Sequence, residues 1–411
     1  MFGDRFAPCR SRRLVPRDAP PSGRAWLVQF LDCQEPPNPR QCNRTPRFDR
    51  TARRTYRFRT ADGVHSKSSF RDSELLLLEE LWDAPMGRLL CPEANYGVVG
   101  TILAGATAVV EMTESSARAA RLCRRNAAAN DASAAVSLLA DLRELSRVYD
   151  AAAYAPKPYT PLAVGKQRIA DSLAALRPGG DIYVAATARA GAGRYENCLR
   201  NVAASVETVA ERDGCRLLRA TRGESLSSPA YVTCRRLKPT VDGVDLSLRT
   251  VPGLFAAGGL DAGTRLLLES AGVTNGERVL DLCCGYGAIG AYAAGIADCE
   301  VHLSDDDRVA TACAERSLGA TDVDGTVVTA DCTHGVSDRT FDRVLCNPPT
   351  HAGDGVLSTL FAGTHDILAG DGELRLVHHR ALDLSAHLAP FETVERLETG
   401  TEHVVFVARP R

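Results

Sequence analysis

Apolar residues in the C-terminal part of the chain gather in short runs that alternate with longer, helix-like segments. The helix-like segments include DRVATACAERSL at 307–318 and VLSTLFAGTHDIL at 356–368. The strand-like runs occupy residues 278–284, 300–305, 325–331, 341–347, 372–379 and 402–409. Strands that alternate with helices in this way build a mostly parallel sheet with helices on both faces. The pattern therefore predicts a doubly wound α/β domain in residues 247–411.

An internal duplication predicts a second domain of the same kind upstream. The segment that starts at Phe58 aligns without a gap with the segment that starts at Leu248, a shift of 190 residues. At the same shift RLLCPEANYGVVG meets RVLDLCCGYGAIG, and two residues of slippage then bring YDAAAYAPK opposite FDRVLCNPP. A repeat of this length matches a complete α/β domain and exceeds a solenoid unit. We therefore predict two tandem Rossmann-like domains, at residues 54–240 and 247–411.

Residues 1–53 differ from the rest of the chain in composition. They are rich in Arg and Pro and lack sustained apolar periodicity, which predicts a disordered tail. Two interpretations of this tail stay open. It is either an upstream over-extension of the reading frame or an arginine-rich arm that contacts RNA.

Composition excludes several classes of protein. With 411 residues, of which 45% are hydrophobic and 24% charged, the chain can bury the cores of two domains. No apolar run approaches the roughly 18 residues of a membrane-spanning helix. The 14 cysteines are scattered and include no C-x-x-C pair, so we expect a reduced, cytoplasmic protein without a structural metal.

The net charge of −2 conceals an uneven distribution. Residues 1–53 hold 11 Arg against 5 acidic residues, and the remainder holds 38 basic against 46 acidic residues. Nucleic-acid enzymes usually carry a basic surface, so the mildly acidic body counts modestly against a naked RNA substrate.

A glycine-rich turn follows the first strand of the C-terminal domain. The strand reaches Asp281, and Gly285 and Gly287 follow where the chain must turn sharply and let a ligand approach the backbone. This arrangement is typical of a nucleoside pocket. Glycine-rich turns also close ordinary βα units, so the motif alone leaves that alternative open.

Two further acidic residues end the next two strands. Asp305 ends the second strand, where a carboxylate can accept hydrogen bonds from ribose hydroxyls. Asp331 ends the third strand, where it can meet an adenine amino group. Either residue can instead cap the following helix, and the adjacent Asp306 and Asp307 leave the ribose assignment open by a residue or two.

The sharpest motif is Asn347-Pro348-Pro349 at the end of the fourth strand. Proline restricts its own φ and the residue before it, so the Asn347 side-chain carbonyl and the Pro348 backbone carbonyl can act as fixed acceptors. Such acceptors can hold an exocyclic amine in line with a methyl donor and stabilise the charge that develops on it. The alternative is a proline-stiffened strand exit.

Neighbouring residues add candidates with weaker support. His351 lies just past the turn, where it can contact substrate or assist proton loss, although a histidine in an ordinary loop is an equal alternative. We assign Cys283, Cys284 and Cys346 to packing, because small buried thiols commonly do only that.

The order and spacing of these motifs resemble those of class I S-adenosylmethionine-dependent methyltransferases. More narrowly, the chain resembles the ribosomal RNA small-subunit guanine-N2 methyltransferases with tandem methyltransferase domains. The resemblance implies that Asp281, Cys283, Gly285 and Gly287 line the methionine end of S-adenosylmethionine, Asp305 the ribose and Asp331 the adenine. It assigns the target amine to Asn347, Pro348 and Pro349. Two departures stand out, because Cys283 replaces a glycine and Thr350 replaces an aromatic that would stack on a flipped base.

The first copy has lost the chemistry-bearing residues of the second. Cys91 stands opposite Asp281, and Ala155 stands opposite Asn347. We expect its fold to persist without catalysis and to serve in substrate recognition or in chaperoning the second domain.

These observations together predict methyl transfer from S-adenosylmethionine to guanine N2 of ribosomal RNA, free or in an assembling small ribosomal subunit. Alternatives are methylation of a protein side-chain amide or a small metabolite, or a non-catalytic RNA-assembly factor. We expect a cytoplasmic monomer that binds neither membrane nor metal.

Overall fold

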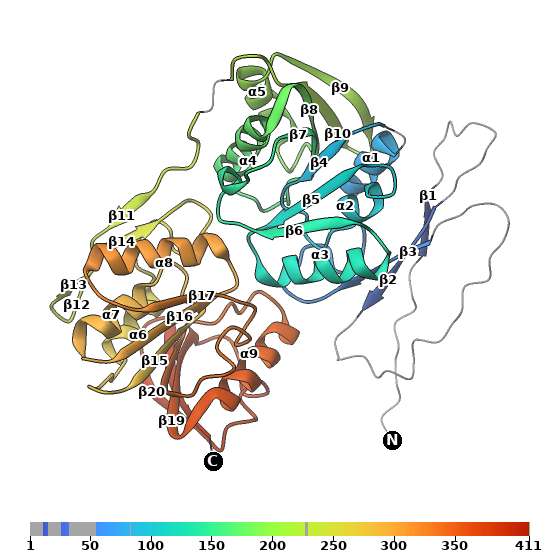
Figure 1. Ribbon diagram of the computed structural model, residues 1–411. Helices are drawn as coiled ribbons and strands as arrows, with labels where there is room; N and C mark the ends of the chain where they lie inside the picture. The colour runs from blue at the N-terminus through green and yellow to red at the C-terminus, as the bar shows by residue number, and fades with distance from the viewer. Residues whose placement is uncertain (1–10, 15–25, 33–54, 83, 227–228, 411) are drawn as a thin grey trace, which may run out of the picture.

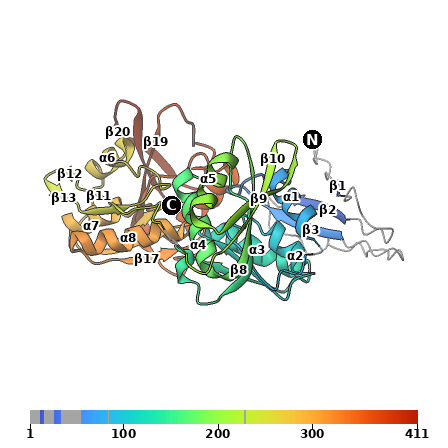
Figure 2. The same cartoon turned by 90° about the horizontal axis from the view of Figure 1, so that it is seen from above.

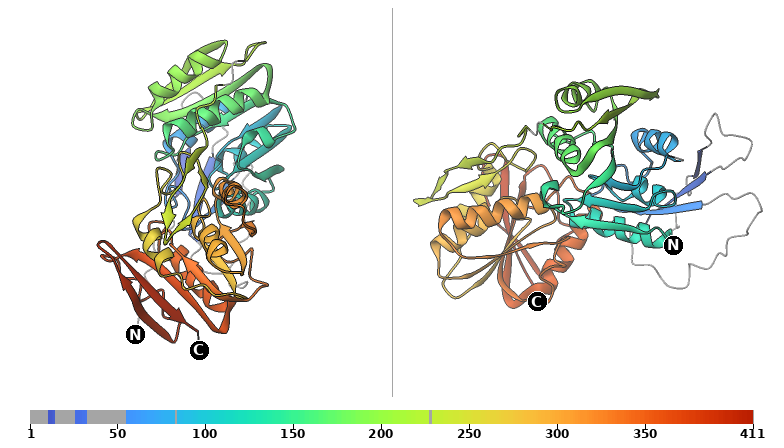
Figure 3. Two further views of the ribbon diagram at one scale, coloured as in Figure 1. Left: turned by 90° about the vertical axis from the view of Figure 1, so that its left-hand side faces the viewer. Right: turned by 45° about the horizontal axis from the view of Figure 1, so that its top comes forward.

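The computed structural model describes residues 11–14, 26–32, 55–82, 84–226 and 229–410. Two lobes, each built on a seven-stranded sheet, lie side by side (Figures 1 and 2). They remain distinct in the two further views of Figure 3. In the described part of the chain no helix has the length and apolar character needed to cross a membrane.

The first lobe begins with β3 (Thr55–Thr60) and α1 (Asp72–Leu81). Its sheet has the strand order β6-β5-β4-β7-β8-β10-β9. The strands are β4 (Arg88–Cys91), β5 (Val109–Glu114), β6 (Ala134–Leu138), β7 (Tyr149–Tyr154), β8 (Leu176–Thr187), β9 (Ser205–Arg212) and β10 (Cys215–Thr221). The connecting helices are α2 (Val98–Leu103), α3 (Ala117–Ala129), η1 (Leu142–Glu144), α4 (Leu162–Ala175) and α5 (Ala192–Val202).

Four short strands join the lobes: β11 (Arg235–Leu237), β12 (Thr240–Val241), β13 (Val244–Asp245) and β14 (Leu248–Thr250). The second sheet has the order β17-β16-β15-β18-β19-β21-β20. Its strands are β15 (Arg278–Leu282), β16 (Glu300–Asp305), β17 (Thr326–Thr329), β18 (Phe341–Cys346), β19 (Leu368–His379), β20 (Thr393–Thr399) and β21 (His403–Arg409). Its helices are α6 (Ala262–Glu269), α7 (Ala288–Ile296), α8 (Arg308–Thr321) and α9 (Asp354–Ile367).

The two sheets share one topology. In each, the first five strands of the order pair in parallel and the last two add in antiparallel fashion. The predicted fold class, two tandem doubly wound and mostly parallel sheets, is therefore confirmed. The strand order also explains the repeat of 190 residues, because each copy is one complete sheet with its helices.

The core of the second lobe lies on both faces of its sheet. Successive strand residues point to opposite faces. Val279 and Leu345 pack in a cluster with residues of α6, α7 and α8, and Leu280 and Val344 pack in another with residues of α9. Both faces of the strands are covered, which is why the strand sequences read as nearly continuous apolar runs.

Part of the predicted tail falls within the described residues. β1 (Ser11–Leu14) and β2 (Trp26–Asp32) form a three-stranded sheet with β3, on the side of the first lobe away from the second lobe (Figure 1). Within the tail, which is predicted to be mostly disordered, the apolar run WLVQFLD pairs in parallel with β3. The other residues of the predicted tail lie outside the described residues.

Candidate active site

The candidate residues of the second lobe meet at the carboxyl edge of its parallel strands. Leu282 of β15 pairs with Ser304 of β16 on one side and with Cys346 of β18 on the other. The residues that come next along each strand therefore reach the same edge of the sheet. In open α/β sheets, ligands bind in the crevice at this edge.

The turn after β15 has the backbone of a ligand cradle. Gly285 and Gly287 have φ of +54° and +81°. A Cβ at Gly287 would lie 2.9 Å from the Cβ of Ala314 in α8, so the helix packs too closely for any side chain. A Cβ at Gly285 would meet nothing within 4 Å. The turn is thus closed on its helix side and leaves space beside Gly285.

Cys283 adopts a left-handed conformation in the same turn, with φ of +62°. This region favours glycine and is uncommon for other residues. A hydrogen bond with Cys346, together with burial, raises the pKa of the Cys283 thiol well above its usual value. A thiol that stays neutral is a poor nucleophile, which agrees with the assignment of these cysteines to packing.

Asp281 lies fully buried beneath the turn. Its Oδ2 accepts a hydrogen bond of 2.8 Å from the backbone N–H of Gly290 in α7. Its Oδ1 has no hydrogen-bond partner within the described part of the chain. Burial raises the pKa of Asp281 to about 8, and the nearby Asp305 adds to the shift. Since buried polar atoms are rarely left unpaired, this oxygen is suited to a donor supplied by a ligand.

The three consecutive acidic residues that begin with Asp305, the last residue of β16, have separate roles. Asp305 faces the glycine turn, where its two oxygens accept from the backbone N–H of Gly285 at 2.8 Å and of Asp307 at 2.9 Å. Asp306 accepts from the first lobe, and Asp307 caps α8 by accepting from Val309 at 2.9 Å. Only Asp305 is therefore placed beside the turn, and burial raises its pKa to about 7.

Asp331, which was expected to meet an adenine amino group, is paired with two arginines in the structure. Arg118 Nη2 lies 2.6 Å from its Oδ1, and Arg121 pairs with its Oδ2. Both arginines come from α3 of the first lobe, and the Asp331 side chain is only 6% exposed. A contact with adenine at this position would share the carboxylate with the first lobe.

The Asn347 carboxamide is oriented by the start of α6. Its Nδ2 donates to Thr264 Oγ1 at 2.9 Å and to Asp261 Oδ2 at 3.4 Å. Because a carboxylate only accepts hydrogen bonds, the amide nitrogen must face α6. The Oδ1 carbonyl consequently points away from α6, and within the described part of the chain it accepts no hydrogen bond.

The rest of the motif forms a tight turn. The Pro348 carbonyl accepts from the backbone N–H of Thr350 at 2.9 Å, and the Pro349 carbonyl accepts from Ala352 at 2.9 Å. The Pro348 oxygen predicted to receive a substrate amine thus already holds one hydrogen bond, and a carbonyl can accept a second. His351 is exposed on the turn before α9.

Several contacting residues were missed by the sequence analysis. Asp261 and Thr264 orient Asn347, and Arg118 and Arg121 hold Asp331. The signal for the first pair was present, because Asp261 directly precedes the helix-like stretch that contains Thr264 and caps α6 by accepting from its backbone N–H. The sequence held no signal for the arginines, which lie more than 200 positions from Asp331.

The first lobe retains the turn but fills its crevice. Glu93, Asn95 and Gly97 have φ of +48°, +61° and +86°, which matches the turn at Cys283, Gly285 and Gly287. The Asn95 carboxamide bonds to both the N–H and the carbonyl of His65, at 3.1 and 2.8 Å. The Lys157 side chain is 13% exposed, and its ammonium lies 3.4 Å from Glu114. At the position of Gly285, beside which a Cβ would meet nothing, the first lobe thus carries the Asn95 side chain, which is bonded to its own chain.

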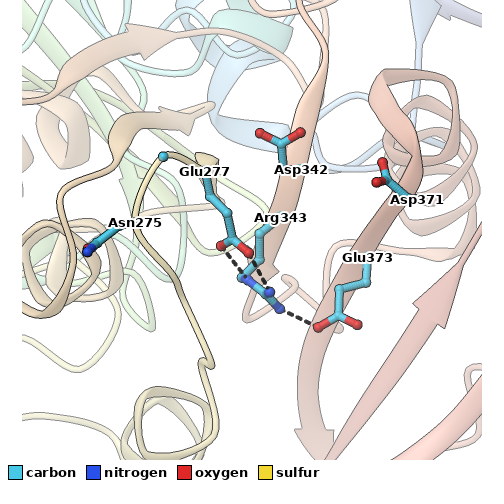
Figure 4. Close-up of a pocket in the computed structure, with 7 residues that line it drawn as sticks. Asn275, Glu277, Asp342, Arg343, Asp371 and Glu373 are labelled. Carbon is cyan, nitrogen blue, oxygen red and sulfur yellow. Dashed lines mark hydrogen bonds and ion pairs between the residues drawn. The ribbon is translucent and has the colours of Figure 1, made fainter.

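A separate hollow of about 400 Å³ opens at the other edge of the second sheet (Figure 4). In it the Arg343 guanidinium lies between the carboxylates of Glu277 and Glu373. The lining groups are therefore paired with one another near the amino ends of β15 and β18. This hollow is remote from the strand ends that carry the candidate residues.

Both lobes of the chain are similar to proteins of one known family. The family model "Methyltransferase small domain" matches twice, at residues 55–219 and 245–407. "Ribosomal RNA small subunit methyltransferase C" of Pseudomonas paraeruginosa is 32% identical over 253 residues, which cover 58% of this chain and 73% of that protein. "Ribosomal RNA large subunit methyltransferase G" of Aeromonas hydrophila is 32% identical over 186 residues, which cover 42% and 49%.

A solved structure shares the fold of both lobes. The 16S rRNA N2 methyltransferase of T. thermophilus, in complex with AdoMet and guanosine, superposes with a TM-score of 0.73. The match covers 85% of this chain and 94% of that chain, at 24% sequence identity. Two matches to one family model, each spanning one lobe, account for the duplication and confirm the predicted family. The chain belongs to the methyltransferase small domain family.

Proposed function

We propose that this methyltransferase moves a methyl group from S-adenosylmethionine to an exocyclic base amine of ribosomal RNA, with guanine N2 as the acceptor. The observation that carries the proposal is the orientation of Asn347, whose amide nitrogen is held by Thr264 and Asp261. Its free carbonyl lies at the strand edge that also bears the glycine turn. The names of the relatives, which refer to ribosomal RNA methylation, support the choice of substrate.

The residues at the turn suit S-adenosylmethionine. The space beside Gly285 and the unpaired Oδ1 of buried Asp281 provide a cradle and an unused acceptor. Asp281, Cys283, Gly285 and Gly287 would hold the methionine part, and Asp305 would accept from the ribose hydroxyls. Asp331 would accept from the adenine amine. When bound, the cofactor supplies an electrophilic methyl group on a sulfonium centre.

The acceptor residues act on the amine of the target base. The lone pair of an exocyclic amine is delocalised into the ring, so the nitrogen is a weak nucleophile. Hydrogen bonds from this amine to Asn347 Oδ1 and to the Pro348 carbonyl would hold the nitrogen in place. They would also stabilise the positive charge that develops on it. No strong base is needed, and the exposed His351 is available to take the proton afterwards.

The charge of the chain is divided in a way that suits an RNA substrate. Residues 241–411 hold 12 basic and 26 acidic residues, whereas residues 54–240 hold 26 basic and 20 acidic residues. The acidity that argued against RNA is therefore confined to the second domain. We propose that the first domain supplies the electrostatic attraction to the phosphate backbone and the second domain supplies the chemistry.

One residue favours a second candidate acceptor. Thr350 stands where an aromatic residue would stack on a flipped base. Without that platform, the same acceptors also suit a protein side-chain amide or an amine of a small metabolite.

We place the enzyme in the cytoplasm as a monomer, where assembling ribosomal subunits are its substrate.

Replacement of Asn347 tests the proposal. Asn347→Ala should lower kcat on ribosomal RNA by about 100-fold, the range seen when one transition-state acceptor or donor is removed. Calorimetry should find S-adenosylmethionine binding within twofold of wild type. Asn201→Ala, an exposed substitution on α5, is the matched control and should keep full activity. Full turnover by Asn347→Ala would contradict the proposed role.

A further inference from the structure

Two arginines of the first domain contact the residue that would receive the adenine. Arg118 approaches one oxygen of Asp331 and Arg121 the other, so both oxygens are held. The side chains of Asp331 and Arg118 are 6% and 9% exposed, and Arg121 is 37% exposed. Each carboxylate oxygen retains a second acceptor position. The pairing therefore orients Asp331 without using up its capacity to accept a hydrogen bond.

The amino end of α3 is itself docked on the second domain. The Asp306 carboxylate accepts from Ser116 Oγ and, at 2.8 Å, from the backbone N–H of Arg118. The backbones of the two turns form an antiparallel bridge, with Ala117 N donating to the Asp306 carbonyl at 2.8 Å. In return, Arg308 N donates to the Ser115 carbonyl at 2.8 Å. The backbone of Arg118 is consequently fixed relative to the second domain.

A second contact links Arg118, through Asp62, to the loop between Asn347 and α9. Arg118 Nη1 donates at 3.2 Å to the carbonyl of Asp62, and the Asp62 carboxylate accepts at 2.8 Å from Gly355 N at the start of α9. A Cβ at Gly353 would lie 2.7 Å from Asp62 Cγ. The close packing leaves no room for a side chain there. The first domain thus contacts both Asp331 and the loop that follows Asn347.

We propose that Arg118, assisted by Arg121, is a positioning residue for the cofactor, so that the degenerate first domain completes the S-adenosylmethionine site of the second. This inference rests on the proposed cofactor use and assigns the first domain a part in it. A buried carboxylate held at both oxygens presents its remaining lone pairs in a set direction. Without its partners Asp331 is left buried and unpaired, which disfavours an ordered acceptor.

The alternative is that the two arginines block Asp331. In that case their removal would free the carboxylate and tighten cofactor binding. If they position it, their removal weakens binding. Affinity for S-adenosylmethionine therefore separates the two directly.

The test uses the full chain with Arg118→Met, which removes the charge and keeps the length of the side chain. Calorimetry with S-adenosylmethionine and with S-adenosylhomocysteine should show Kd about tenfold higher for both. The KM for S-adenosylmethionine should rise by the same factor, while kcat at saturation falls less than twofold. Arg125→Met, an exposed substitution on the same helix, is the control and should leave Kd unchanged. Arg118→Lys should recover part of the affinity.

A double-variant cycle separates positioning from a general effect on the fold. Arg118→Met should add little to the loss caused by Asp331→Asn, because both act through the same carboxylate. If Arg118→Met does not fold, the more exposed Arg121→Met should raise Kd about threefold. Unchanged or tighter binding, or fully additive losses, would overturn the inference. Failure of the wild-type chain to bind the cofactor would instead overturn the proposed function.

Discussion

Asp281 is buried and Asp305 is half-buried at the glycine turn, and their removal from water raises their pKa values to about 8 and about 7. Their positions could be predicted from the sequence, because residues at the ends of neighbouring parallel strands reach one edge of the sheet. Their protonation could not. It depends on how completely α7, α8 and the turn exclude water, and on the unpaired Oδ1 of Asp281. The pattern of apolar residues does not encode such details.

The raised pKa of Asp281 predicts a specific pH dependence of stability. Its protonated form is favoured in the fold, so this contribution is present at low pH and is lost as pH rises from about 4 towards about 8. In the cofactor-free protein, the Tm of Asp281→Asn relative to wild type should increase between pH 5.5 and pH 8. With this pKa shift the linked change in stability over that range is about 3 kcal/mol, so the increase should be roughly 6–12 °C, at 2–4 °C per kcal/mol in domains of this size.

The informative quantity is the change with pH in the Tm difference between Asp281→Asn and wild type. A Tm difference that stays constant reports only the altered hydrogen bond to Gly290. Asp242→Asn, in the turn between β12 and β13, is a control with an exposed carboxylate. A Tm difference that does not change with pH would contradict the burial of an ionisable group at position 281.

The start of helix α6 fixes the orientation of the Asn347 side chain, which follows β18. The periodicity of apolar residues predicted the helices α8 and α9 and most strands of the second sheet to within a few residues. It missed β20, because all seven residues of this edge strand are exposed and show no apolar alternation. It also gave no indication that the start of α6 packs against Asn347, because that contact joins residues 83 positions apart.

Removal of the α6 contact should reduce catalysis without affecting cofactor binding. Thr264→Val keeps the shape of the side chain and the backbone cap but removes the oxygen that accepts from Asn347. The carboxamide can then rotate, so we expect kcat to fall about fivefold to tenfold, the equivalent of one hydrogen bond. Steady-state kinetics should find an unchanged KM for S-adenosylmethionine. Thr359→Val, on exposed surface of α9, serves as the control. Unaltered kcat in Thr264→Val would show that Asn347 is held by other means.

At the scale of the whole molecule, two lobes of one fold differ in the residues that they carry at the ends of their strands. The duplication was visible in the sequence, and so was the loss of Asp281 and Asn347 equivalents from the first copy. The filling of its crevice by Asn95 and Lys157 was not, because the direction of a side chain follows from packing in three dimensions. The interface through Arg118 was likewise beyond reach, since it brings together segments that no local pattern connects.

The filled crevice predicts one cofactor per chain. Asn95 stands where the second lobe has Gly285, and its side chain is tied to His65. We expect this side chain and the ion pair of Lys157 with Glu114 to exclude a second molecule. Calorimetric titration of the full chain with S-adenosylmethionine should therefore give a stoichiometry of one. Asp281→Ala should abolish that binding, leaving no residual site. A stoichiometry of two, or binding that survives in Asp281→Ala, would show that the first lobe also takes the cofactor.

Mass spectrometry of the product nucleosides tests the proposal that the second lobe methylates an exocyclic base amine in ribosomal RNA. Unmodified small ribosomal subunits are incubated with S-adenosylmethionine that carries a deuterated methyl group, together with wild type or Asn347→Ala. We expect deuterated N2-methylguanosine from the wild-type reaction and a trace at most from Asn347→Ala. Label absent from the RNA, or present on ribosomal protein instead, would contradict it.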